Sequence, residues 1–169
     1  MGMRQRRPAP DPVQPGQVSV WSFPRPPLLE PVTERVRVEF GGLVIADTRR
    51  ALRVCETASP PTFYLPLEDV TPEVLVPAGG SSWCEWKGQA RYWHVHAGGR
   101  EARLAAWGYP RPTPAFAALR DHVAFYAGRV DACFVGDAPV QPQPGGFYGG
   151  WVTPDLTGPF KGEPGTEHW

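Results

Sequence analysis

Two stretches of the chain alternate polar and apolar residues with a period of two, the pattern of a half-buried β-strand. The first is residues 35–40, and Gly41-Gly42 then marks a turn before the apolar run 43–46. This order predicts a β-hairpin. The second stretch is residues 89–96. Shorter strands are expected at residues 49–55, 63–65 and 130–135.

A helical pattern occurs once. Phe116, Leu119, Val123 and Tyr126 recur at helical spacing and would form one apolar stripe. Thr113 precedes Pro114, which is the order of a helix cap and a first helical residue. We therefore predict one substantial helix over residues 115–127.

Composition narrows the fold class. The chain holds 22 prolines and 19 glycines, which interrupt helices and exclude a helical bundle. We predict a mainly β (α+β) fold, either a small antiparallel β barrel or a sandwich-like sheet, with the single helix and a long C-terminal wrap rich in Gly, Pro and aromatic residues.

A chain of 169 residues has the size of one domain. We expect a flexible leader over residues 1–18, one β-rich domain over residues 19–141, and an extension over residues 142–169. The extension contains five aromatic residues that gain free energy by burial, so it is predicted to dock on the domain. They are Phe147, Tyr148, Trp151, Phe160 and Trp169.

Charge indicates few macromolecular partners. Seventeen basic and 17 acidic residues cancel, so we expect no nucleic acid or anionic membrane partner. No apolar run reaches the roughly 20 residues of a bilayer span, and the first residues carry charge without the apolar stretch of a secretory signal. We expect a cytoplasmic protein. Its three cysteines form no Cys-x-x-Cys pair, which indicates neither a disulfide framework nor a zinc ribbon.

Cys84 and Lys87 are the first candidates for chemistry. They lie three residues apart beside two tryptophans. A cation close to a cysteine favours the thiolate, which is a nucleophile and a metal ligand. The alternative is a structural cysteine and a solvated lysine. An extended chain would place the two side chains on opposite faces, so they meet only if Gly88 or a bulge bends the strand.

A second group of residues suggests a binding pocket. Arg50, Glu56 and Tyr64 fall on neighbouring predicted strands, and Trp107 and Tyr109 end a later one. These side chains could stack on a planar ligand and bind it by hydrogen bonds. The alternative is an aromatic core with Arg and Glu paired at its rim.

His94 and His96 share one face of the strand predicted over residues 89–96. Two histidines are fewer ligands than a zinc site needs. Cys84, Cys55 or Glu56 could supply a third, but nothing in the spacing requires it. We therefore predict no metal site.

Several short motifs together resemble a known family. They are residues 35–38 with their hairpin, residues 53–56, Tyr64, Cys84-Glu85-Trp86-Lys87-Gly88, Arg91-Tyr92-Trp93, Ala106-Trp107-Gly108-Tyr109-Pro110, Val123-Ala124-Phe125-Tyr126 and Arg129-Val130-Asp131. The combination is similar to the bacterial family catalogued as domain of unknown function 427, over roughly residues 34–137.

The resemblance implies a small β-rich fold with one helix, and this family is sometimes labelled nucleotidyltransferase-like. The common nucleotidyltransferases place Gly-Ser ahead of an Asp-x-Asp pair that holds two magnesium ions. Gly80-Ser81 is present, but no Asp-x-Asp or Asp-x-Glu follows it, and the Walker lysine pattern is absent.

Three functional hypotheses follow. The first is a small-molecule pocket, with or without catalysis, in which Cys84, Lys87 and Glu56 are the catalytic candidates and Arg50, Tyr64, Trp107 and Tyr109 bind the ligand. The second is a scaffold whose aromatic tail pairs with a partner chain. The third is the nucleotidyltransferase-like activity that the resemblance implies. The motifs assign no cofactor, reaction or oligomeric state.

Overall fold

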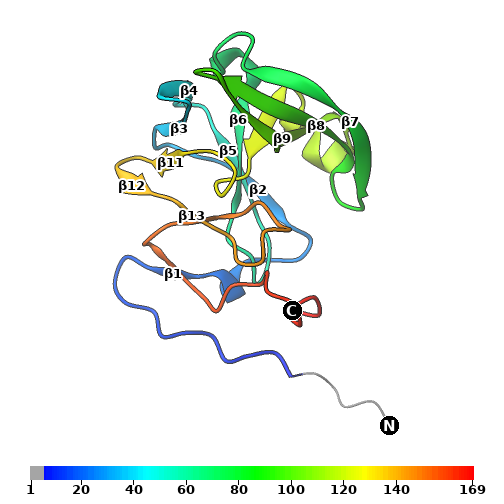
Figure 1. Cartoon of the computed structure of the whole chain (residues 1–169). Coiled ribbons are helices and arrows are strands. Elements are labelled where there is room, and N and C mark those ends of the chain that lie inside the picture. Colours follow the sequence, from blue (N-terminus) through cyan, green and yellow to red (C-terminus); the bar gives the residue numbers. More distant parts are fainter. Residues whose placement is uncertain (1–5) are drawn as a thin grey trace.

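The computed structural model describes residues 6–169, and short antiparallel strands dominate it (Figure 1). Three single-turn or two-turn 3₁₀ helices, η1, η2 and η3, lie between the strands. In chain order the elements are β1 (Val18–Ser19), η1 (Val20–Ser22), β2 (Leu28–Pro31), β3 (Val36–Phe40), β4 (Leu43–Thr48), β5 (Leu52–Cys55), β6 (Thr62–Pro66), η2 (Leu67–Asp69), β7 (Leu75–Cys84), β8 (Gly88–Ala97), β9 (Arg100–Pro112), η3 (Pro114–Leu119), β10 (His122–Phe125), β11 (Ala132–Val135), β12 (Ala138–Pro139), β13 (Gln141–Pro142), β14 (Trp151–Val152) and β15 (Leu156–Thr157).

Two antiparallel sheets carry most of the fold. The larger has seven strands in the order β2-β5-β6-β10-β9-β8-β7, and the smaller has four in the order β12-β11-β3-β4. The predicted mainly β, antiparallel fold is confirmed. Within residues 6–169 the seven-stranded sheet ends at β2 and β7 without pairing them, so the predicted alternative of a closed barrel is wrong.

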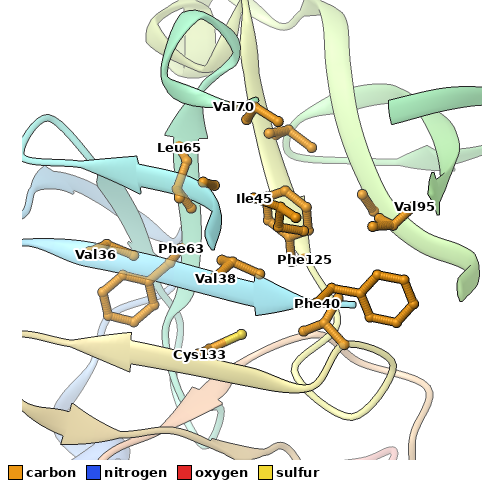
Figure 2. Packing of buried hydrophobic residues seen from close by; sticks show 14 of the residues in the cluster. Val36, Val38, Phe40, Ile45, Phe63, Leu65, Val70, Val95, Phe125 and Cys133 are labelled. Carbon is orange, nitrogen blue, oxygen red and sulfur yellow. The ribbon is translucent and has the colours of Figure 1, made fainter. Parts of the chain in front are cut away.

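The main core lies between these sheets. Strand β3 alternates buried and half-buried residues, as the period-2 pattern predicts, and places Val36, Val38 and Phe40 inside. Figure 2 shows these side chains meeting Phe63 and Phe125 from the larger sheet. Burial of apolar surface of this kind is the main stabilising term of a small domain.

The predicted helix over residues 115–127 is wrong. Only Pro114–Leu119 is helical, as a 3₁₀ helix with a kink at Phe116, and Thr113 makes no side-chain cap. Residues 122–125 instead form β10, where Val123 pairs with Leu65 of β6 and Ala124 with Trp107 of β9. The apolar run is compatible with a strand buried on both faces as well as with a helical stripe. Pairing with strands that are distant in the sequence determines which of the two forms.

The C-terminal segment packs on the domain through Trp151. Its indole is fully buried, stacks on Phe63 with ring centroids 5.1 Å apart, and donates a hydrogen bond from Nε1 to the Phe125 carbonyl at 2.9 Å. Phe147 differs, because 75% of its surface is exposed. The burial expected of the tail aromatics therefore applies to Trp151 and not to Phe147.

The N-terminal segment contacts the C-terminal one. Residues 1–5 of the predicted flexible leader lie outside the described residues. Further along, the Asp11 amide donates to the Gly158 carbonyl at 2.8 Å, and β1 pairs in parallel with β15. No helix among residues 6–169 has the length and hydropathy to cross a membrane.

Candidate functional site

An open cavity of about 740 Å³ lies between the β7–β9 hairpins, the end of β5 and the C-terminal segment. Its lining is rich in aromatic side chains, contributed by strands, turns and the tail. They are Trp83, Trp86, Tyr92, Trp107, Tyr109, Tyr126, Phe147 and Tyr148. Most ligand pockets are of this size and are predominantly apolar with a few polar groups.

Trp107, Tyr126 and Arg129 form a stack in this wall. The Trp107 and Tyr126 ring centroids are 4.4 Å apart, and the Arg129 guanidinium lies 3.9 Å from the Tyr126 centroid. Arg129 also donates from Nη1 to the Leu104 carbonyl at 2.6 Å. Leu104 has a left-handed backbone (φ +49°) at an irregular part of the β8–β9 pairing, so the bulge aims its carbonyl at Arg129.

The tail closes part of the cavity over Trp107. Gly149 lies so close to this indole that a Cβ atom at residue 149 would overlap it. The buried Gln143 fixes the tail, accepting from the Gly150 amide at 3.0 Å and donating to the Lys161 carbonyl at 2.8 Å. One buried amide thereby holds both arms of the tail that reach the cavity.

Cys84 and Lys87 flank the β7–β8 turn. Strand β7 ends at Cys84 and β8 begins at Gly88, whose φ of +106° suits a residue without a side chain. Thr113 holds this turn, donating from Oγ1 to the Trp86 carbonyl at 2.5 Å and from its amide to the Lys87 carbonyl at 3.1 Å. Because the extended backbone stops at Cys84, the turn lets Cys84 and Lys87 line the same cavity.

Three cations at the cavity lie over aromatic rings. Lys87 Nζ is 5.4 Å from the Tyr109 centroid and Lys161 Nζ is 5.3 Å from the Tyr148 centroid. Arg129 over Tyr126 is the third. The negative face of each ring attracts the cation above it and holds it in place.

Glu56 contributes a carboxylate to the cavity. Its Oε2 lies 3.5 Å from Nη2 of Arg25, and both side chains are about 30% exposed. Burial lowers the pKa of the Lys161 ammonium, as does the charge of Arg25, while Glu56 and Glu167 act in the opposite direction. The carboxylate, the two cations and the tail thus meet at one side of the cavity.

Tyr64 lies beneath the cavity and does not line it. It is fully buried, with its ring centroid 6.3 Å from that of Tyr109. Burial raises the pKa of both phenols well above the usual range. The Tyr64 hydroxyl has no hydrogen-bond partner among the described residues, although Trp107 and Tyr109 are close to it.

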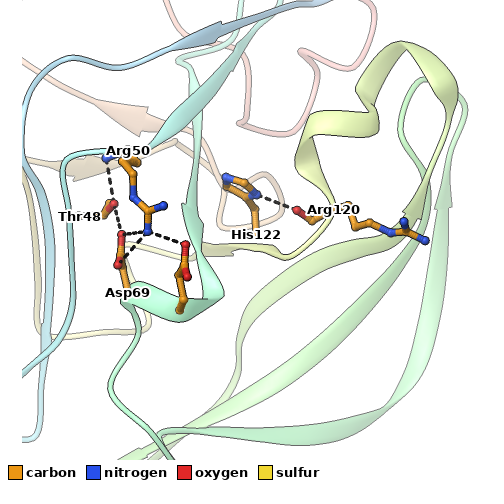
Figure 3. A network of polar contacts seen from close by, with 6 residues as sticks. Thr48, Arg50, Asp69, Arg120 and His122 are labelled. Atoms are coloured by element: carbon orange, nitrogen blue, oxygen red, sulfur yellow. Dashed lines mark hydrogen bonds and ion pairs between the residues drawn. The ribbon is translucent and has the colours of Figure 1, made fainter.

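Arg50 is far from this group. Figure 3 shows it bound to the turn of η2, where Nη2 lies 2.6 Å from Glu68 Oε1 and 3.1 Å from Asp69 Oδ2. Thr48 donates to the same Asp69 carboxylate at 2.6 Å. Arg50 therefore fastens the β4–β5 turn to η2, and it is not one of the residues that line the cavity.

The two histidines of β8 have separate partners. His94 Nδ1 accepts a hydrogen bond from the Leu104 amide at 2.9 Å, and His96 Nε2 lies 3.7 Å from Glu101. No group of three His, Cys, Asp or Glu side chains within residues 6–169 is arranged to hold a metal ion.

Five of the site residues predicted from the sequence line the cavity: Glu56, Cys84, Lys87, Trp107 and Tyr109. The prediction did not include other residues that line it. Those it missed are Tyr92, Tyr126, Arg129, Tyr148 and Lys161. One available signal was the scarcity of lysine, because Lys87 and Lys161 are the only lysines among the 17 basic residues of the chain.

A second cavity, of about 490 Å³, lies at β2 and β5. It is lined by Glu30 and Arg53, which form an ion pair at 2.6 Å, and by Asp155. The Glu30–Arg53 pair is already formed, and the cavity holds one aromatic ring, Phe63, which belongs to the core. The larger cavity is the better candidate for a site.

Comparison with known proteins identifies a family. A family model described as domain of unknown function (DUF427) matches residues 28–136, more than half of the chain. The match includes Cys84, Lys87, Trp107 and Tyr126, while Tyr148 and Lys161 of the tail lie beyond it. No curated protein matches the chain.

Proposed function

The chain belongs to the family of domains of unknown function DUF427, and we propose that it binds a planar small molecule in the aromatic cavity. One observation carries this proposal: aromatic residues from β8, β9, the β7–β8 turn and the tail line a single cavity of about 740 Å³. A volume of this kind accommodates a metabolite-sized ligand.

Stacking provides the recognition. Trp107 and Tyr126 already pack against each other at 4.4 Å, and Trp86 and Tyr109 line the same cavity. A planar ring lying against the aromatic walls of the cavity gains both apolar burial and the preferred offset or edge-to-face geometry. The polar side chains available to orient it include those of Glu56, Lys87 and Cys84.

The test is a titration of ¹⁵N-labelled protein with 2-naphthol, a planar and neutral probe, observed through the tryptophan indole N–H signals. The signals of Trp86 and Trp107 should shift. Those of Trp21 and Trp151 should not, because their N–H groups are bonded to carbonyls outside the cavity. Equal shifts of all four signals, or none, would refute the proposal.

A matched pair of variants sharpens this test. Trp86→Leu should weaken naphthol binding about threefold to tenfold, the loss of one aromatic contact. Phe134→Leu changes an equally half-buried aromatic on β11, where the ring lies under Arg37 and away from the cavity. It should bind like the wild type.

The residues do not fit the magnesium site of a nucleotidyltransferase. Two magnesium ions need several carboxylate oxygens. Among the described residues that line the cavity, Glu56 is the one carboxylate, and Arg25 lies beside it. The cavity thus offers cations where magnesium chemistry needs carboxylates.

Catalysis at Cys84 is a second candidate. Its thiol is free, half-buried and part of the cavity lining, whereas Cys55 and Cys133 are buried elsewhere. A thiol that lies beside a bound ligand could attack that ligand as a nucleophile. Retention of ligand binding with loss of turnover in Cys84→Ser would identify this role.

A further inference from the structure

We propose that the cavity selects a planar ligand that carries a carboxylate or phosphate group, and that Lys87 and Lys161 recognise this anionic group. The inference rests on the proposed function and specifies the charge of its ligand.

The distribution of lysine is the first support. The chain has 15 arginines and two lysines, and both lysines line the same cavity, although they are far apart in the sequence. Lys87 comes from the β7–β8 turn, and Lys161 comes from the tail that folds over the domain. Folding thus brings both compact ammonium groups, each with three rotatable donors, to the lining of one cavity.

The second support is that neither ammonium forms a close ion pair within the described part of the chain, although the more distant carboxylates of Glu56 and Glu167 raise the pKa of Lys161. Among residues 6–169, the arginines Arg35, Arg50, Arg53 and Arg100 each lie within 3.0 Å of a carboxylate oxygen. Neither lysine has a carboxylate oxygen within 4.0 Å among these residues, and each lies over a tyrosine ring instead. An aromatic face holds a cation in place without occupying its hydrogen-bond donors, which preserves its capacity to bind an anion.

The third support is the charge balance of the lining. Among residues 6–169 it includes Lys87, Arg129 and Lys161 and a single carboxylate, Glu56, with Arg25 within 3.5 Å of it. A net positive, partly water-excluded cavity attracts anions and disfavours cations. Burial and Arg25 also make the charged form of Lys161 costly, and a ligand anion beside the ammonium would relieve that cost.

The ring and the charge together define the ligand class. The aromatic walls require a planar ring, and the ammonium groups require an acidic substituent on it. Aromatic carboxylates and phosphorylated heterocycles share this chemistry. A carboxylate and a phosphate probe on the same ring distinguish them.

The experiment compares four probes that share one ring: 1-naphthaleneacetate, 1-naphthyl phosphate, the neutral 1-naphthaleneacetamide and the cationic 2-(1-naphthyl)ethylammonium. Affinities are measured by calorimetry on the wild type, Lys87→Gln, Lys161→Gln and the control Arg49→Gln. Arg49 is exposed and does not line the cavity. At least one of the two anions should bind about fivefold to tenfold tighter than the amide, as expected for hydrogen bonds to a charged group.

Each lysine variant should remove most of that difference between the anions and the amide, while Arg49→Gln should keep it. If the anions and the amide bind equally, or the ammonium binds best, the inference is overturned and a planar-ligand pocket remains. If none of the four probes binds, the proposed function fails and the inference fails with it. Thermal unfolding of each variant verifies that it is folded.

Discussion

Gly149 of the tail lies against the indole of Trp107, and a Cβ atom at residue 149 would overlap Cη2 of that ring. The contact joins the C-terminal segment to the wall of the cavity. It also places Tyr148, the neighbour of Gly149, beside the same cavity. The shape of the site therefore depends on a residue that has no side chain.

Gly149→Ala should destabilise the protein by about 1–3 kcal/mol, the usual cost of forcing an added methyl group into a packed position. Urea unfolding measures this, and the Trp107 indole N–H signal should shift in the same variant. Gly79→Ala is the control, because residue 79 has open space around it and an ordinary backbone. Its stability should stay within about 0.5 kcal/mol of the wild type. Equal stability of the two variants would mean that the tail does not lie on Trp107.

Trp151→Ala should cost about 3–5 kcal/mol, because it removes a fully buried aromatic side chain. Trp151→Phe should cost less, about 1–3 kcal/mol, since it keeps the stacking on Phe63 and loses the hydrogen bond to the Phe125 carbonyl. Trp83→Ala serves as the matched control, with 73% of the indole exposed. In urea unfolding, the loss of stability should be largest for Trp151→Ala, smaller for Trp151→Phe and smallest for Trp83→Ala. A Trp151→Ala protein as stable as Trp83→Ala would contradict the prediction.

Local patterns predicted the strands well. The alternation over residues 35–40 and 89–96 corresponds to β3 and β8. Every second side chain of β3 is in the core, as a period of two requires, whereas the burial pattern of β8 is interrupted at residues 92–94, where its pairing with β9 shifts. The helical stripe failed at Val123, since residues 122–125 find partners on β6 and β9 that no local pattern encodes. The spacing of apolar residues shows which side chains of a segment can be buried. The topology of the sheets determines which neighbouring strand they pack against.

The residues of the cavity were predicted only in part, because tertiary contacts place some of them. Glu56, Cys84, Lys87, Trp107 and Tyr109 lie along it. The carboxylates of Glu68 and Asp69 draw Arg50 away, because a short ion pair on the adjacent turn competes for its guanidinium. Lys161 and Tyr148 could not be placed from the sequence, because they reach the cavity only after the tail has docked.

The Asp131 carboxylate should titrate below its ordinary value of 3.8, because the Gly41 amide and then Arg100 bond to its charged form. A pKa that is lower in the folded state stabilises the protein above the unfolded pKa, and this stabilisation is lost as the pH falls through the folded value. Carboxyl ¹³C NMR measures the titration. In Arg100→Gln the pKa should rise but stay below 3.8, since the Gly41 bond, the larger cause, remains.

The dependence of stability on the protonation of Asp131 can also be measured directly. Asp131→Asn should be less stable than the wild type at pH 7, and the difference should shrink as the pH falls below about 3.8. Asp137→Asn is the control, because Asp137 is exposed and its side chain makes no hydrogen bond among residues 6–169, whereas Gly41 and Arg100 both bond to Asp131. A constant difference between Asp131→Asn and the wild type from pH 7 to pH 2 would refute the prediction.

Cys84 should be the one thiol that iodoacetamide alkylates rapidly in the native protein. Cys55 and Cys133 are 1% and 2% exposed, and burial raises the pKa of Cys55 to about 12 and that of Cys133 further. Both therefore remain covered and protonated at pH 8, while Cys84 is half-buried at the cavity. Mass spectrometry should find one modified residue per native chain and three in urea.

Two variants test what surrounds this thiol. Cys84→Ser should leave no rapidly modified residue. Lys87→Gln should slow alkylation of Cys84 about twofold or more if the ammonium stabilises the thiolate across the turn, since even a partly exposed charge pair has an effect of this size. Arg49→Gln controls for net charge and should react at the wild-type rate. If Lys87→Gln and Arg49→Gln react alike, Lys87 does not act on the thiol, and its role is confined to the ligand.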